Sequence, residues 1–194
     1  MPRPTLDREA ALQYLGAYGV FLVDCPVIAL GIRGGLEKGR PNAVGSFDDL
    51  MAIVTGDVCE GFTGNTDPST EIPGRANLVT GLHRFKQGLH HPGTPQQYPA
   101  FVQDGPILVK RWLTVDTTLA GTIDPQRGEY RGAGLWKGDF AIHIHNAMGE
   151  NTTGSEGCQT IIKHEWDEYH ALLAGELARH YLVSFPYLLV DAAA

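Results

Sequence analysis

The apolar residues of this chain come in short runs that glycine, proline and polar residues interrupt. Of its 194 residues, 24 are glycine and 12 are proline, and both residue types favour turns and end regular elements. Frequent interruption by these residues is more typical of many short β-strands than of a helical bundle. No internal repeat and no linker divides the chain. We therefore predict a single domain over residues 1–194, of mainly β (α+β) class.

Two segments near the ends of the chain have helical spacing instead. In the N-terminal region, residues 1–19, the side chains of Ala11, Leu15 and Tyr18 recur at the spacing of one helical face, which predicts a helix over 6–18. Trp166 begins a second apolar stripe of this kind, with charged residues opposite, which predicts a helix after the cysteine motif described below.

The remaining apolar runs predict strands, and the glycine-rich runs between them predict loops. Strands are expected over 20–24, 27–32, 50–55, 82–85, 107–112, 140–145 and 181–190. Loops are expected over 37–46 and 61–74, and hairpins or a lid over 114–138.

Charge and cysteine usage narrow the possible partners and compartments. The formal net charge is −7 with both signs interspersed, which argues against nucleic acid or an anionic membrane as the main partner. The N-terminus lacks the apolar core of a signal peptide, and no apolar run reaches transmembrane length. Cytoplasmic synthesis without a signal peptide is therefore expected. The three cysteines form neither a CxxC pair nor an even framework, which favours a reducing compartment.

One stretch, residues 140–162, concentrates residue types that carry chemistry. It begins as an alternating strand in which His143 and His145 share one face. A polar loop with two glycines follows, and Cys158 comes 13 positions after His145. That spacing leaves room for the loop to fold back and bring the thiol to the end of the strand.

A thiol becomes a nucleophile when a base removes its proton and backbone N–H groups hold the resulting oxyanion. His145, at the strand end, is the candidate base. The peptide between Gly157 and Cys158 is the candidate oxyanion donor, since Gly157 has no side chain to shield it. Ser155 is placed either to orient the histidine or to hold a substrate carbonyl.

The same stretch resembles the active-site segment of the L,D-transpeptidase family. That family has an Ile-His strand end, a glycine-containing loop and a Ser-His-Gly-Cys motif, and here the corresponding pieces are Ile144-His145, Gly149 with Gly154, and residues 155–158, SEGC. The TxGSxGCQT version with a following tryptophan is most similar to a phage-type branch. Two departures stand out: Glu156 replaces the motif histidine, and Gln159-Thr160 replaces an arginine-bearing turn. The match covers residues 140–166, which we take as the active-site segment.

The resemblance implies both a fold and an activity. The implied fold is an L,D-transpeptidase-like β-sandwich. The implied activity is attack of Cys158, with His145 as base and Ser155 and Gly157 as shaping residues, on a stem peptide of peptidoglycan. An amine would resolve the thioacyl-enzyme to a cross-link and water would resolve it to a cut; for a phage-type lysis or tail-associated protein, cutting is expected. The expected partners are peptidoglycan and other virion proteins, at the cell wall or within a virion, with no cofactor.

Four further residues are predicted to bind substrate. Arg33, at a strand end beside glycines, is suited to a carboxylate. His143 shares the face of His145, Glu156 stands within the cysteine motif, and His91 belongs to a His-His pair at the predicted rim of the cleft.

Two alternatives from other classes remain open at this level. The first is a zinc-dependent peptidase that uses His143, His145 and one residue of the pair His90-His91, because imidazoles are good zinc ligands. The second is a non-catalytic virion or cell-wall-binding protein that keeps the fold without the chemistry. The exchange of the motif histidine for Glu156 favours this second alternative.

Overall fold

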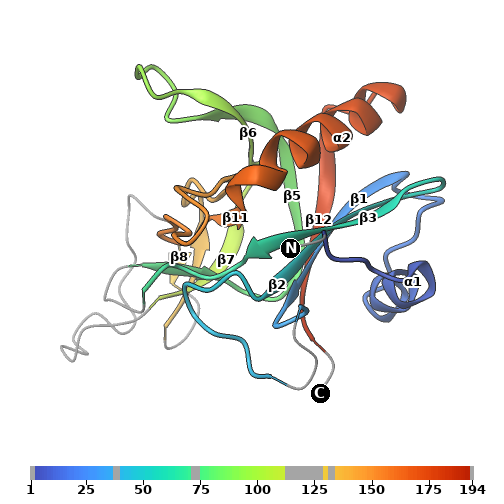
Figure 1. The fold of residues 1–194 in the computed structure, drawn as a ribbon, viewed down its shortest axis with the longest axis horizontal. Helices are drawn as coiled ribbons and strands as arrows, with labels where there is room; N and C mark the ends of the chain where they lie inside the picture. Colours follow the sequence, from blue (N-terminus) through green and yellow to red (C-terminus); the bar gives the residue numbers. More distant parts are fainter. Residues whose placement is uncertain (1–2, 37–39, 71–74, 112–128, 131–133, 193–194) are drawn as a thin grey trace.

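A computed structural model describes residues 3–36, 40–70, 75–111, 129–130 and 134–192. The described residues form an eight-stranded closed β-barrel, a separate four-stranded sheet and two α-helices (Figure 1). In this view α1 and the four-stranded sheet lie on opposite sides of the barrel strands.

The barrel strands do not follow one another in chain order. Around the barrel they are β1 (Val27–Arg33), β12 (Ser184–Asp191), β5 (Gly81–His90), β6 (Tyr98–Gln103), β10 (His143–Asn146), β11 (Gln159–Ile161), β3 (Cys59–Asn65) and β2 (Asp49–Thr55), which returns to β1. Two neighbouring pairs are parallel, β1 with β12 and β10 with β11, and the others are antiparallel.

The second sheet is antiparallel and lies beside the mouth of the candidate site. Its strands are β4 (Ala76–Leu78), β7 (Ile107–Arg111), β9 (Leu135–Gly138) and β8 (Glu129–Tyr130). Arg75, just before β4, and Arg111, the last residue of β7, line the cavity described below. Most of the predicted hairpins or lid over 114–138 lies outside the described residues, apart from β8 and β9.

The predicted L,D-transpeptidase-like β-sandwich is wrong, because the main sheet closes into a barrel. Closure depends on the parallel pairing of β1 with β12, in which Ala29 lies opposite Tyr187. These strands lie at nearly opposite ends of the sequence. Short alternating apolar runs identify strands, but they do not show which strands pair, and a sandwich and a barrel produce the same local pattern.

Two local predictions also fail, for different reasons. Residues 20–24 form a turn rather than a strand, with Val23 almost fully exposed. The predicted loop over 61–74 begins inside β3, because its glycines serve close packing rather than a turn. A Cβ on Gly64 would lie 2.4 Å from Cγ of Met51, so this strand position requires glycine.

Both predicted helices are confirmed. Helix α1 (Arg8–Ala17) begins after Asp7, whose side chain accepts a hydrogen bond from the Ala10 N–H (3.1 Å) and so satisfies one free donor of the first turn. Helix α2 (Trp166–Arg179) buries one apolar face through Tyr169, Leu173 and Leu177. Neither helix of the described chain is long and apolar enough to cross a membrane.

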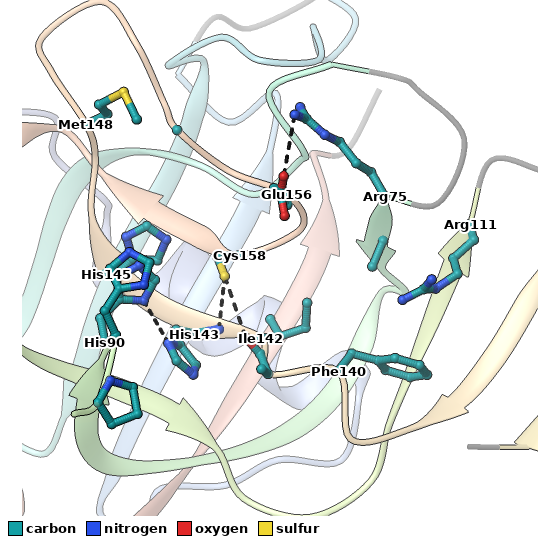
Figure 2. Close-up of a pocket in the computed structure, with 15 residues that line it drawn as sticks. Arg75, His90, Arg111, Phe140, Ile142, His143, His145, Met148, Glu156 and Cys158 are labelled. Carbon is teal, nitrogen blue, oxygen red and sulfur yellow. Dashed lines mark hydrogen bonds and ion pairs between the residues drawn. The ribbon is translucent and has the colours of Figure 1, made fainter. Parts of the chain in front are cut away.

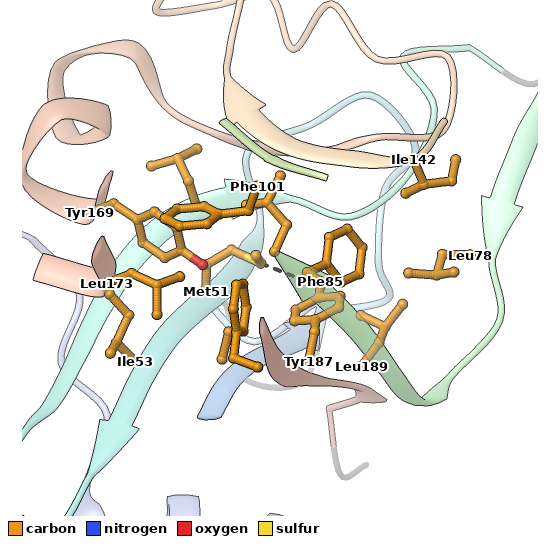
Figure 3. Packing of buried hydrophobic residues seen from close by; sticks show 14 of the residues in the cluster. Met51, Ile53, Leu78, Phe85, Phe101, Ile142, Tyr169, Leu173, Tyr187 and Leu189 are labelled. Atoms are coloured by element: carbon orange, nitrogen blue, oxygen red, sulfur yellow. Dashed lines mark hydrogen bonds between the residues drawn. The ribbon is translucent and has the colours of Figure 1, made fainter. Parts of the chain in front are cut away.

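The core has two layers that the strand alternation creates. Phe85, Phe101 and Tyr187 belong to the cluster inside the barrel, which α2 joins through Tyr169 (Figure 3). Alternate residues of β1, β2 and β12 point outward and pack against Ala11 and Leu15 of α1. These strands are therefore buried on both faces, which explains why they read as continuous apolar runs.

Candidate active site

A cavity of about 740 Å³ opens between the barrel end at β10 and the four-stranded sheet. Figure 2 shows Cys158 at its centre, histidines on one side, and Arg75 and Arg111 on the other. The polar groups that line the cavity come from five separate segments of the chain: Arg75, His90, His91, Arg111, His143, His145, Glu156 and Cys158.

The Cys158 thiol is half-buried and held by backbone groups at and just before the start of β10. The His143 N–H donates to its Sγ (3.4 Å), and its S–H donates to the Ala141 carbonyl (3.8 Å). Ala141 has a φ of 53°, which is strained for a residue with a Cβ. Backbone strain recurs at functional sites, and here it accompanies a carbonyl that faces the thiol.

Burial makes the resting thiol neutral. It raises the pKa of Cys158 to about 11; the hydrogen bond from the His143 N–H opposes this shift, and the Glu156 carboxylate adds to it. At neutral pH the sulfur therefore keeps its proton until a base receives it.

One ring nitrogen of His145 is engaged by the backbone. Its ring is almost completely buried on β10, and Nδ1 lies 2.7 Å from the Asn146 carbonyl oxygen. A carbonyl only accepts, so Nδ1 carries the proton and Nε2 keeps a free lone pair. The Tyr98 hydroxyl lies 3.1 Å from the same Nδ1. Burial lowers the pKa of His145 to about 4, so the imidazole is neutral at pH 7.

The histidines on this side of the cavity contact one another. His90 Nδ1 and His143 Nδ1 are 2.8 Å apart, and the rings of His90 and His145 stack with centroids 4.0 Å apart. His91, at a φ of 51°, turns back so that its ring centroid lies 3.9 Å from that of His90. Burial and the neighbouring imidazoles lower the pKa of His90 to about 3.

This arrangement bears on the zinc alternative. Among the described residues, no three histidine, cysteine or acidic side chains converge on a common point with the geometry of a metal site. The stacked rings of His90 and His145 have nearly parallel planes, with 17° between them. Stacked rings do not direct their nitrogen lone pairs at one ion.

Ser155 shapes the cysteine turn from inside and does not contact the histidines. Its hydroxyl donates to the Cys158 carbonyl (2.7 Å) and accepts from the Gly157 N–H (3.0 Å), and the side chain is almost completely buried. The expected shaping role agrees with these contacts. The alternative roles, orienting the histidine or holding a substrate carbonyl, receive no support from them.

Gly157 is needed for its backbone, and its own N–H is already engaged by Ser155. It has a φ of 138°, and a Cβ there would lie 2.4 Å from the Ala76 carbonyl oxygen. The neighbouring Cys158 N–H, in contrast, is not engaged in this way. Among the described residues, none of the backbone hydrogen bonds of turns and loops has the Cys158 N–H as its donor. The Cys158 N–H is thus the donor left for an oxyanion.

The opposite side of the cavity is charged, and two of its residues were not predicted from the sequence. Arg75, just before β4, lies 3.7 Å from the Glu156 carboxylate and donates to Thr70 Oγ1 (2.7 Å). Arg111, at the end of β7, stacks over the Phe140 ring. Neither arginine belongs to a motif. Their contribution follows from the four-stranded sheet, which the sequence pattern does not place.

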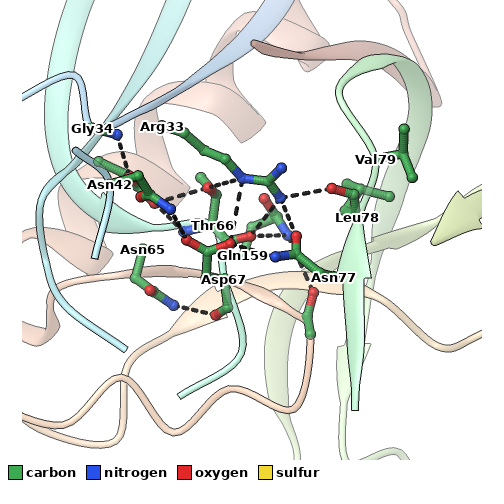
Figure 4. A network of polar contacts seen from close by, with 12 residues as sticks. Arg33, Gly34, Asn42, Asn65, Thr66, Asp67, Asn77, Leu78, Val79 and Gln159 are labelled. Atoms are coloured by element: carbon green, nitrogen blue, oxygen red, sulfur yellow. Dashed lines mark hydrogen bonds and ion pairs between the residues drawn. The ribbon is translucent and has the colours of Figure 1, made fainter. Parts of the chain in front are cut away.

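Of the residues predicted to bind substrate, the structure brings His91, His143 and Glu156 to the cavity and leaves Arg33 outside it. Arg33 instead belongs to a polar network with Thr66, Asp67 and Asn77 (Figure 4). Its guanidinium donates to Thr66 Oγ1 (3.1 Å), the Thr66 carbonyl (3.2 Å), the Leu78 carbonyl (2.6 Å) and Asn77 Oδ1, and it lies 3.5 Å from the Asp67 carboxylate.

Comparison with known proteins gives no further guide to this site. No protein-family model, no curated protein and no solved structure matches the chain.

Proposed function

We propose that this chain is a cysteine-dependent enzyme that acts on the stem peptides of peptidoglycan through a thioacyl-enzyme at Cys158. One observation carries the cysteine chemistry: the thiol and an imidazole with a free Nε2 lone pair line the same cavity. The choice of peptidoglycan depends on the resemblance of residues 140–166 to the L,D-transpeptidase segment. That resemblance concerns the site, since the barrel differs from the fold it implied.

The proposed acylation step conserves atoms and charge. Cys158 Sγ attacks the peptide carbonyl carbon while its proton passes to His145 Nε2, and the carbonyl oxygen becomes an oxyanion at the Cys158 N–H. The carbon–nitrogen bond then breaks, and the imidazolium gives its proton to the leaving amine. With pKa values of about 11 for the thiol and about 4 for His145, the proton remains on sulfur at rest, so its transfer accompanies the attack.

Deacylation reuses the same groups. Water or an amine attacks the thioester carbon, His145 Nε2 takes the proton of the attacking group, and the sulfur leaves and is reprotonated. Water gives hydrolysis and an amine gives a cross-link. For a protein whose motif is most similar to a phage-type branch, we propose hydrolysis at the cell wall.

The charged side of the cavity suits a peptide substrate with ionised groups. Arg75 and Glu156 present opposite charges close to the thiol, and the Glu156 side chain is largely exposed to solvent. A carboxylate of the substrate would pair with the guanidinium, and an amine with the glutamate.

Digestion of purified peptidoglycan tests this proposal. Wild type, Cys158→Ala and Cys59→Ala are compared, each with and without a chelator, and the released fragments are identified by mass. Cys59 is also a free, half-buried cysteine, but it lies outside the cavity, so it controls for loss of a thiol. We expect fragments from wild type and Cys59→Ala, and none from Cys158→Ala. Product that survives Cys158→Ala and disappears with chelator would move the chemistry to the histidines.

A second candidate function is binding without catalysis. The specific observation that favours it is the thiol itself, because burial raises its pKa to about 11 and the Glu156 carboxylate raises it further. A cysteine adapted for attack usually has a lowered pKa. Under this alternative, wild type and Cys158→Ala would bind peptidoglycan equally well and neither would release fragments.

A further inference from the structure

Gln159, the residue after the candidate nucleophile, is completely buried and forms hydrogen bonds through both ends of its amide. Nε2 donates to the Gly157 carbonyl (3.2 Å) and the Thr66 carbonyl (3.4 Å), and Oε1 accepts from the Tyr187 hydroxyl (2.9 Å). These partners fix which end of the amide carries the nitrogen, since carbonyls only accept and the hydroxyl donates to Oε1.

The contact with the Gly157 carbonyl matters because of the geometry of the peptide unit. That carbonyl and the Cys158 N–H belong to the same planar trans peptide, and they point in opposite directions. By holding the carbonyl toward the barrel interior, Gln159 directs the Cys158 N–H away from the interior. This N–H is the donor assigned above to the oxyanion.

Tyr187 supports Gln159 from the opposite side of the barrel. Its strand, β12, and the strand of Gln159, β11, are four places apart among the eight strands, so the phenol spans the interior. The hydroxyl has room because residue 31 is glycine: a Cβ there would lie 2.1 Å from it. The same hydroxyl lies 3.6 Å from Met51 Sδ.

We propose that Gln159, held by Tyr187, is a positioning residue that fixes the Gly157–Cys158 peptide so that the Cys158 N–H stabilises the oxyanion. This inference rests on the proposed function to the extent that Cys158 must form an acyl-enzyme. It explains why glutamine stands where the L,D-transpeptidase segment has a different turn. The residue acts through the backbone and does not touch the substrate.

Two reagents that differ in their need for an oxyanion test the inference. Acetylation of Cys158 by p-nitrophenyl acetate passes through a tetrahedral oxyanion, with a carbon–sulfur bond formed and nitrophenolate released. Alkylation by iodoacetamide displaces iodide directly and forms no oxyanion. Neither reagent requires peptidoglycan, so the test is independent of the proposed substrate.

The variants are Gln159→Leu, which removes both ends of the amide, and Tyr187→Phe, which removes the hydroxyl and keeps the ring. Val190→Ala is the matched control: Val190 is buried on β12 but packs outside the barrel interior, against α1. Loss of a direct oxyanion donor slows turnover about 100-fold to 1,000-fold in known enzymes. For a misdirected donor we expect Gln159→Leu to slow acetylation about 10-fold or more, while alkylation changes less than about twofold.

The outcomes separate the inference from the proposed function. A selective loss of acetylation in Gln159→Leu, smaller in Tyr187→Phe and absent in Val190→Ala, supports the inference even if wild type releases no peptidoglycan fragments. Equal losses of acetylation and alkylation would show a general disturbance of the cysteine turn and overturn it. Unchanged acetylation in both variants, or no Cys158-dependent acetylation of wild type, would also overturn it. If Gln159→Leu does not fold, Tyr187→Phe alone decides by the same ratio of rates.

Discussion

The cavity and the Arg33 network are two polar regions that differ in how their groups are used. In the network, Nε and Nη2 of Arg33 are engaged by groups of its own chain, through contacts to Thr66, Asn77, Leu78 and Asp67. In the cavity, the lining includes a thiol and His145, whose Nδ1 is bonded to the Asn146 carbonyl and whose Nε2 makes no hydrogen bond among the described residues. A buried polar group with all its bonds made stabilises the fold, whereas one with capacity left is available to a ligand.

Backbone strain shows the same division. Ala141 and His91 are non-glycine residues with positive φ, and both line the cavity. In the Arg33 region, the residue with positive φ next to the network is Gly34, which adopts that conformation without strain. Two of the three described non-glycine residues with positive φ are therefore at the cavity, and the third, Tyr181, lies outside its lining.

The largest expected effect is on the cavity side. His145→Gln removes the basic Nε2 but leaves an amide that can donate to the Asn146 carbonyl. We expect peptidoglycan cleavage to fall by about 100-fold to 10,000-fold, the contribution typical of a general base. The free energy of unfolding should change little by comparison. Initial rates of fragment release, with urea unfolding in parallel, measure both. Full activity in His145→Gln would remove this residue from the mechanism.

The next effect is on the network side and concerns stability. Arg33→Met leaves the buried Asp67 carboxylate without its cation, and removal of one partner from a buried pair typically costs about 3–5 kcal/mol. We expect urea unfolding to show a loss of that order, while iodoacetamide alkylation of Cys158 stays within about twofold in the folded protein. Arg84→Met is the control, since Arg84 is exposed and contacts the Ser184 hydroxyl. Equal losses in the two variants would contradict the structural role of Arg33.

A smaller effect is expected at the border between the regions. Gly157→Ala places a Cβ 2.4 Å from the Ala76 carbonyl oxygen at a φ of 138°. Such a position should cost about 2 kcal/mol of stability and lower the acetylation rate of Cys158. Gly149→Ala is the matched control in the same loop, because a Cβ there meets no atom within 4 Å. If thermal unfolding shows equal stability for the two variants, the close approach of Gly157 to β4 is not needed.

The smallest effect is a pH dependence of stability. The folded-state pKa of His145 is about 4, below the ordinary value of 6.5, so between these values the unfolded chain binds a proton that the folded chain excludes. Stability is therefore lost as pH falls from about 6.5 toward 4. Asp49 acts in the opposite sense, since burial raises its pKa to about 7. The contribution of His145 is isolated as the difference between wild type and His145→Gln.

We expect wild type to lose about 1 kcal/mol more per pH unit than His145→Gln between pH 6 and pH 5. Urea unfolding at each pH gives the two slopes. Parallel slopes would mean that His145 is accessible to protons in the folded protein.

The sequence predicted local structure well and long-range pairing poorly. Helical spacing located both helices, and the alternation at His143 and His145 placed both imidazoles on the cavity side. Barrel closure was missed because it depends on the pairing of β1 with β12, which leaves no local signal. The loop predicted over 61–74 was wrong at Gly64 for a related reason. A glycine that allows close packing cannot be distinguished in the sequence from a glycine that allows a turn.

In the candidate site, too, local features could be predicted from the sequence and long-range contacts could not. The residues of the cysteine motif, Ser155 to Cys158, are adjacent in the sequence and lie in one turn, so their proximity could be predicted from the sequence. Arg75 and Arg111 were missed because the four-stranded sheet brings them in from segments without a motif. Arg33 was assigned to substrate because a strand-end arginine is a common anion ligand. Its actual partners come from residues 66–67 and 77–78, which the sequence does not show to be its neighbours.

The most direct test of the account is the mass of the protein after incubation with soluble stem-peptide fragments. We expect an adduct equal to the acyl part of the fragment, located on the peptide that contains Cys158, absent from Cys158→Ala and released by hydroxylamine, which cleaves thioesters. An unmodified wild-type protein whose Cys158 still reacts with iodoacetamide would contradict it, as would fragment cleavage by Cys158→Ala.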